Sequence, residues 1–142
     1  MAAPTFELLL IPGLVFGLIL GIYEAIVLVK DVQVPTHKFG HAFQALTLTT
    51  ALTFVSMNVD WVLATFTFLQ GIPIISIPIV LRIVVGLIAA VKIHAASRVA
   101  KGMGGASGMG ETWAHTFIIG ILIIGVPYLY PIIQPMLPAF LQ

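Results

Sequence analysis

Cysteine is absent from the 142-residue sequence, and charged residues make up only 8% of it. Without cysteine, the chain cannot build disulfide frameworks, thiolate metal sites, iron–sulfur clusters or a cysteine nucleophile. Soluble domains carry about a quarter charged residues, so this composition cannot cover a water-exposed surface. A net charge of +1 also lacks the clustered lysine and arginine that a nucleic-acid interface needs. We therefore expect no nucleic-acid partner and no soluble domain.

Apolar residues are abundant: they form 60% of the sequence and give a mean hydropathy of +1.15. A run of roughly 20 apolar residues is long enough to cross the hydrocarbon core as a helix. The sequence predicts one all-α integral membrane domain, residues 1–142, whose two helical hairpins supply four transmembrane helices at about 6–29, 42–69, 72–96 and 113–131. The proline-rich apolar tail, 132–142, is expected at the membrane interface or against a neighbouring subunit.

The basic residues of the loops predict the orientation. Lys30 and Lys38 lie in the first predicted loop and Arg98 and Lys101 in the third, whereas the second loop and the tail have none. Positively charged loops stay cytoplasmic, so both termini are expected to be extracytoplasmic. Nothing basic precedes Lys30, so we expect the first segment to remain as an anchor of a cell-membrane protein and not to be removed as a signal peptide.

Asp60 and Arg82 are charged residues inside otherwise apolar segments. Each is about eleven residues, or roughly 16 Å of helix rise, from the turn near Gly71, which puts both at one expected depth. An isolated charge at the bilayer centre costs roughly 2.5 to 3.5 kcal/mol on insertion scales. We predict an Asp60–Arg82 ion pair that either locks the second helix against the third or belongs to an ion or proton path.

A polar stripe leads along the second helix to this acid. Thr49, Thr53, Ser56 and Asp60 follow spacings of four, three and four, which places them on one helix face, while Asn58 marks a second, weaker polar face. Such a stripe can hold water or ions. Alternatively, its hydroxyls bond carbonyls of their own helix or of a neighbouring one.

Glycine recurs every fourth residue in the first segment, at Gly13, Gly17 and Gly21, and Ala25 extends the series. This glycine zipper is a smooth ridge on which another helix can pack closely. The partner is either a helix of the same chain or a second copy, and we favour self-association. Gly86 lies on the arginine-bearing face of the third helix, which is expected to meet the second helix.

All four histidines fall near the predicted cytoplasmic boundary: His37, His41, His94 and His115. Imidazole ligates transition metals and haem, so these residues raise the hypothesis of a haem or metal site. The alternatives are anchoring in the headgroups, with no cofactor, and a response to pH. Glu24 and Glu7 lie towards the two ends of the first segment, and we expect both to reach the interface by snorkelling.

No catalytic motif is present. The glycine-rich segment 102–110 lacks the Gly-Lys-Ser/Thr ending of a phosphate-binding loop and follows no strand. No HExxH motif occurs, and no serine, histidine and carboxylate are expected together at one depth. We therefore expect a protein that is not an enzyme.

The leading hypothesis is a multi-pass membrane subunit that self-assembles or joins a larger complex through its glycine zipper and apolar tail. Its partners would be the lipid bilayer and further membrane subunits. A small oligomeric ion channel or proton-coupled transporter is the first alternative, with the Asp60–Arg82 pair and the polar stripe as its path. A redox subunit that uses the histidines is the second.

Overall fold

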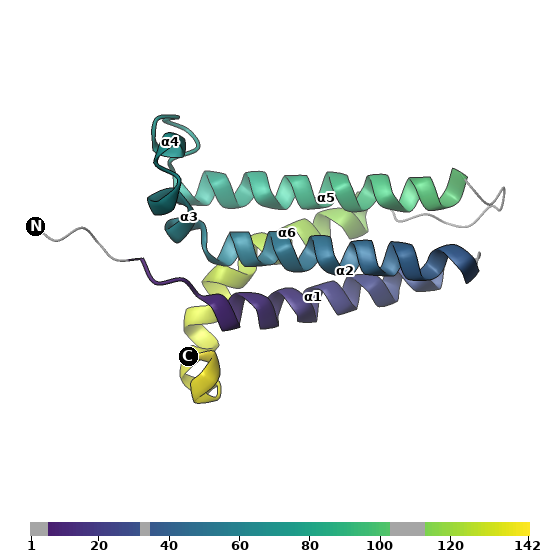
Figure 1. Cartoon of the computed structure of the whole chain (residues 1–142), viewed down its shortest axis with the longest axis horizontal. Helices are drawn as coiled ribbons and strands as arrows, with labels where there is room; N and C mark the ends of the chain where they lie inside the picture. The colour runs from purple at the N-terminus through teal and green to yellow at the C-terminus, as the bar shows by residue number, and fades with distance from the viewer. Residues whose placement is uncertain (1–5, 32–34, 103–112) are drawn as a thin grey trace, which may run out of the picture.

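In a computed structural model, which describes residues 6–31, 35–102 and 113–142, the described chain is helical and contains no β-strand. Four long helices lie alongside one another in an elongated bundle: α1 (Leu10–Asp31), α2 (Pro35–Met57), α5 (Pro78–Gly102) and α6 (Trp113–Ile133) (Figure 1). Short elements gather at one end of it, namely α3 (Val59–Thr65), α4 (Thr67–Gln70) and the 3-10 turns η1 (Gln134–Met136) and η2 (Ala139–Leu141). We call this the α3 end.

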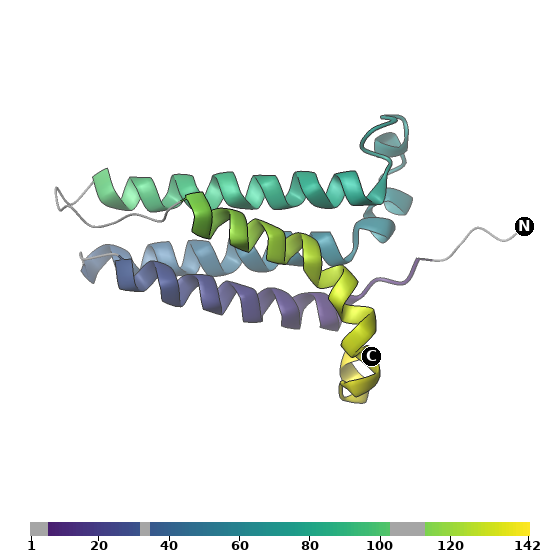
Figure 2. The ribbon, with the colours of Figure 1, turned by 180° about the vertical axis from the view of Figure 1, so that it is seen from behind.

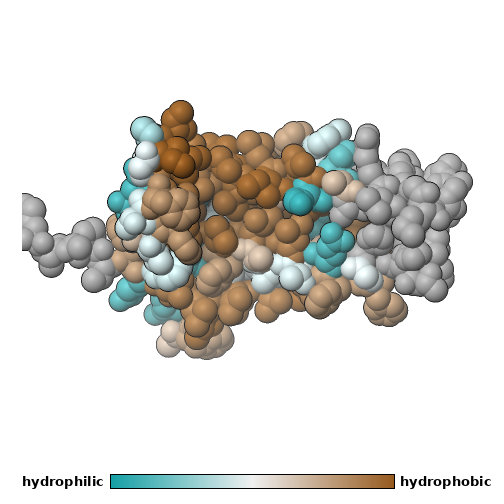
Figure 3. Space-filling view, turned by 45° about the horizontal axis from the view of Figure 1, so that its top comes forward, coloured by the Kyte–Doolittle hydropathy of each residue, from teal (hydrophilic) through white to brown (hydrophobic). Residues whose placement is uncertain are grey.

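The bundle has the surface of a membrane protein. Three helical stretches are long and apolar enough to cross a bilayer, Leu10–Val29, Pro78–Ala95 and Trp113–Met136, and α2 with α3 forms a fourth candidate that is bent. On the face seen in Figure 3, hydrophobic residues cover the middle of the molecule, and hydrophilic ones lie towards the two sides of this region. The fold is thus the expected all-α membrane type, with three to four candidate spans.

The helix expected at 42–69 is interrupted at Asn58, where α2 ends and α3 departs at an angle of 75°. The Asn58 side chain explains the break. Its Nδ2 donates to the Phe54 carbonyl at 2.9 Å, and its Oδ1 accepts the Leu9 backbone N–H at 2.7 Å. An asparagine amide that bonds the backbone in this way competes with the helical hydrogen-bond ladder. The weaker polar face noted in the sequence therefore positions the bend and fastens the N-terminal segment to it.

The third helix begins at Pro78, and not at residue 72 as expected, because residues 71–77 form turns. A proline at the first position of a helix lacks only an N–H that would have no intrahelical partner. Arg82 therefore lies about 6 Å of rise from the start of α5, much closer to the helix end than the expected 16 Å. The ion pair belongs to the α3 end of the bundle.

The fourth helix ends within two residues of the predicted end near residue 131. Pro127 and Pro131 lie inside α6, which ends at Ile133. The helix curves along its length, and η1 and η2 follow it at the α3 end (Figure 2). Tyr130 fixes this tail, because its hydroxyl donates to the Leu141 carbonyl at 2.8 Å. Each proline removes one backbone hydrogen bond, which is consistent with the curvature.

The glycine zipper packs against α2 of the same chain. A methyl group at Gly17 would lie 2.7 Å from the Thr50 carbonyl oxygen, and one at Gly21 would lie 2.7 Å from that of Leu46. Gly13 is similarly covered by Phe54, and Ala25, next in the series, is half-buried. The expectation of self-association through this ridge is wrong, since α2 buries the ridge within the chain.

Gly86 contacts α6, and not the second helix as expected. A methyl group at Gly86 would lie 2.8 Å from the Gly120 carbonyl oxygen, and one at Gly120 would lie 2.8 Å from that of Gly86. The two glycines thus form a reciprocal backbone crossing of α5 and α6. The sequence misplaced this contact because Arg82 reaches α2 and α3 as well as α6, whereas Gly86, one turn further along α5, packs on α6.

Candidate functional site

Arg82 and Asp60 are in contact at the α3 end. The Arg82 Nη2 atom lies 2.7 Å from the Asp60 Oδ2 atom. The arginine side chain is only 11% exposed, whereas that of Asp60 is 42% exposed. Tyr128 adds a second contact, because its hydroxyl lies 3.5 Å from Arg82 Nη1 and its ring centre 5.3 Å from the guanidinium carbon. The guanidinium is therefore buried among α3, α5 and α6, and the carboxylate faces outwards.

Arg82 also bridges the break between α2 and α3. Its Nε donates to the Ser56 carbonyl oxygen at 3.2 Å, in the last turn of α2. Carbonyl oxygens in the last turn of a helix have no intrahelical partner. In discontinuous membrane helices, such carbonyls commonly coordinate a bound cation. Here the cation is a side chain, which bridges the end of α2 to the carboxylate of α3.

The hydroxyl stripe of α2 is buried in the centre of the bundle: Thr49, Thr53 and Ser56 are all 0% exposed. The Ser56 hydroxyl donates to the Ile123 carbonyl on α6 at 2.8 Å, and that of Thr53 to the Thr49 carbonyl at 2.7 Å. The Thr49 hydroxyl has no hydrogen-bond partner within the described part of the chain. Asp60, predicted on the same face, lies beyond the bend in α3. Arg82 links its carboxylate to the Ser56 carbonyl at the end of the stripe.

A second polar cluster lies towards the opposite end, which we call the Glu24 end. The Glu24 side chain is 0% exposed, and its Oε2 lies 3.0 Å from His115 Nε2 on α6. The snorkelling expected of Glu24 is therefore wrong. The sequence did hold a signal, because Glu24 follows Gly21 by three residues and Gly17 by seven, which places it on the packed face of α1.

His94 and Trp113 complete this end of the bundle. Their rings stack with centres 3.7 Å apart and an interplanar angle of 17°, and His94 is buried. On α5, His94 follows Arg82 by twelve residues, about 18 Å of rise. The two polar clusters thus occupy opposite ends of the apolar bundle, with the hydroxyl stripe between them.

The structure describes the side chains of two of the four histidines proposed as metal ligands, His94 and His115. Within the described residues, no group of three or more histidine, aspartate or glutamate side chains could hold a metal ion. His115 contacts Glu24, and His94 stacks on Trp113. The other expected ligands, His37 and His41, have side chains outside the described residues. Residues 103–110 of the glycine-rich segment also lie outside them, as do the side chains that set the expected orientation (Lys30, Lys38, Arg98 and Lys101).

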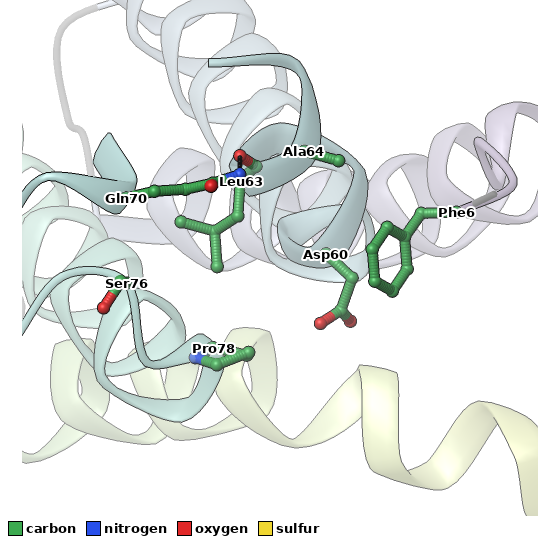
Figure 4. A pocket seen from close by; sticks show the side chains of 7 residues that line it. All are labelled: Phe6, Asp60, Leu63, Ala64, Gln70, Ser76 and Pro78. Carbon is green, nitrogen blue, oxygen red and sulfur yellow. Dashed lines mark hydrogen bonds between the residues drawn. The ribbon is translucent and has the colours of Figure 1, made fainter. Parts of the chain in front are cut away.

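A pocket of about 500 Å³ opens beside the Asp60 carboxylate. It lies where the N-terminal segment, α3, α4 and the start of α5 meet, and Figure 4 shows its lining residues: Phe6, Asp60, Leu63, Ala64, Gln70, Ser76 and Pro78. The sequence did not indicate this pocket, because it depends on the bend at Asn58.

No protein-family model matches the chain, and searches of curated proteins and of solved structures likewise find no match. Its function must therefore be argued from the two polar clusters and the pocket.

Proposed function

We propose that this chain is a proton-translocating membrane subunit. The observation that carries the proposal is the complete burial of Glu24, in an apolar helix and in hydrogen-bond contact with His115. An ionisable residue inside a membrane helix is costly and commonly marks a proton or substrate path. A carboxyl group and an imidazole at 3.0 Å can share and exchange one proton, which is the elementary step of a relay.

The stripe on α2 supplies a route from this pair towards the α3 end. Gly21 packs against Leu46 and Thr50, so the Thr49 level lies near Gly21, about one helical turn from Glu24. From Thr49, the side chains of Thr53 and Ser56 continue along the same face to Arg82. A hydroxyl both donates and accepts a hydrogen bond, which suits it to passing protons. Thr53 and Ser56 donate to backbone carbonyls in the structure, so a relay requires these hydroxyls to rotate and donate along the row.

Arg82 favours protons over metal cations as the transported species. Its guanidinium already binds the Ser56 carbonyl and the Asp60 carboxylate, the oxygens that would otherwise attract a cation. A proton passed along hydrogen bonds needs no vacant coordination site. With the loop charges on the cytoplasmic side, the path would run from Glu24 inside to the α3 end outside. Protons would pass beside Arg82 and not through it, because a guanidinium stays protonated.

Proton flux into liposomes tests this function. The purified protein is reconstituted, a potassium gradient with valinomycin sets the membrane potential, and an internal dye reports pH. We expect flux well above that of empty liposomes for the native protein and for Glu7→Gln, whose carboxylate is exposed. Glu24→Gln should reduce the flux at least tenfold. Native protein that conducts no more than empty liposomes would refute the proposal.

The tail supports a second candidate function, assembly with further membrane subunits. Ile132, Met136 and Phe140 are 72%, 85% and 65% exposed, and they lie at or beyond the end of α6. Native mass spectrometry of the chain and of Met136→Ser/Phe140→Ser distinguishes this role. Assembly through the tail predicts oligomers of the native chain that dissociate in the double variant but persist in Phe39→Ser. Phe39 lies in the second turn of α2 and is 86% exposed. A monomeric native chain would contradict self-assembly through the tail.

A further inference from the structure

We propose that the pocket beside Asp60 binds a primary ammonium group carried on an apolar body. Among the side chains that line the pocket, Asp60 alone is charged, and Arg82 lies behind it. Arg82 donates to Oδ2 of the carboxylate, which is 42% exposed. Two carboxylate oxygens offer about four acceptor positions, so this carboxylate can accept further hydrogen bonds from a ligand.

The two other polar side chains of the pocket also present acceptors, and each already uses a donor within the chain. Gln70 Nε2 donates to the Leu63 carbonyl at 2.7 Å, and the Ser76 hydroxyl donates to the Pro73 carbonyl at 2.9 Å. The amide oxygen of Gln70 and the lone pairs of Ser76 are left as acceptors. One carboxylate and two neutral acceptors together favour a ligand with several N–H donors and a positive charge. A primary ammonium group has three such donors.

The apolar lining selects the rest of the ligand. Phe6, Leu63, Ala64 and Pro78 provide the carbon surface of the pocket. The Phe6 ring lies beside the Asp60 carboxylate, with Gln70 and Ser76 across the pocket from it (Figure 4). An aromatic ring next to a carboxylate favours a cation, since the face of the ring attracts positive charge through its quadrupole. The volume of about 500 Å³ suits a small organic molecule.

Two sources could supply this chemistry, a free alkylammonium ion or the ammonium headgroup of an aminophospholipid. Binding of the amine and its transport are separate steps. Transport of the bound amine would rest on the proposed function. Binding itself does not depend on the Glu24 cluster, which lies at the other end of the bundle. Glu24→Gln should therefore keep native amine affinity even where proton flux is lost.

Calorimetric titration of the purified protein in a neutral detergent tests the site, with hexylammonium as the probe. Hexanol, hexanoate and hexyltrimethylammonium are matched controls that lack the charge, reverse it or lack the N–H donors. We expect only hexylammonium to bind measurably, and Asp60→Asn to weaken it at least tenfold. Equal binding of hexanol or hexyltrimethylammonium would overturn the proposal.

Because Asp60→Asn also disturbs the ion pair, a second variant keeps the test decisive. Ala64→Leu fills the pocket without removing a polar group and should also weaken hexylammonium at least tenfold, whereas Ala95→Leu, at an exposed position on α5, should not. Unchanged binding to Ala64→Leu would contradict the site. In nanodiscs, competition by phosphatidylethanolamine but not by phosphatidylcholine would identify the lipid headgroup as the ligand; equal hexylammonium binding in both would identify a free amine.

Discussion

Arg82 donates to the Ser56 carbonyl at 3.2 Å and to the Asp60 carboxylate at 2.7 Å, so one guanidinium joins the two sides of a broken helix. The relationship gives a physical reason for an arginine inside a span. The end of α2 exposes carbonyl oxygens that attract positive charge, and the arginine provides that charge from within the chain. The bend, the ion pair and the pocket beside it consequently form one structural unit.

Removal of one charge from this unit should be more damaging than removal of both. We expect Asp60→Ala to lower the free energy of unfolding by about 1 to 3 kcal/mol, because it leaves a mostly buried guanidinium without its carboxylate. The double variant Asp60→Ala/Arg82→Ala should recover part of this loss. Denaturation in a mild detergent measures both. A double variant no more stable than the worse single variant would show that the pair is not coupled.

A free guanidinium ion should partly replace the missing side chain. Arg82→Ala leaves the Ser56 carbonyl and the Asp60 carboxylate around a space of guanidinium shape. Millimolar guanidinium is therefore expected to raise the melting temperature of Arg82→Ala and not that of the native protein. Tetramethylammonium, which cannot donate hydrogen bonds, is the control ion. Equal responses to the two ions would exclude a specific site.

The close approach of Gly86 and Gly120 predicts the effect of an added methyl group on α6, and Gly125 on the same helix provides the control. Gly120→Ala should destabilise the protein by about 1 to 3 kcal/mol, because the added methyl would meet the Gly86 carbonyl at 2.8 Å. Gly125→Ala has open space around it and should stabilise α6 by up to about 1 kcal/mol. Thermal denaturation compares them. The packing account fails if both substitutions have the same sign and size.

Asn58 should control the angle between α2 and α3. The side chain of leucine in its place cannot bond the Leu9 N–H or the Phe54 carbonyl, so the helical ladder can continue and the 75° bend should open. Because the sequence has no cysteine, spin labels can be placed at Phe43→Cys and Phe68→Cys alone. Asn58→Leu should change the measured distance distribution, and Thr47→Leu, at an exposed position of α2, should not.

The sequence predicted much of the architecture and little of the packing. Hydropathy alone indicates an all-α membrane protein, because apolar length is a property of each segment. Which helix meets which depends on tertiary contacts, so the sequence only favours a second copy as the partner of Gly17 and the second helix as that of Gly86, whereas Gly17 packs on α2 and Gly86 on α6. The bend at Asn58 was not predicted either, since a single asparagine in an apolar run does not by itself stop a helix.

The candidate site was predictable to the same limited degree. Asp60 and Arg82 were expected to pair from their positions in the sequence, and the structure places them in contact, although nearer a helix end. The Glu24–His115 contact joins residues 91 positions apart, and no local pattern links them. Only the register of Glu24 with the glycine zipper pointed to its burial.

The Thr49 hydroxyl provides the most direct test of a path between the two polar clusters. It is buried without a hydrogen-bond partner in the described chain, so Thr49→Val, which keeps the shape, should leave stability unchanged or raise it. If the hydroxyl relays protons, the same substitution should reduce liposome proton flux at least tenfold, whereas Thr47→Val, at an exposed position of α2, should conduct like the native protein. Native flux through Thr49→Val would contradict the path.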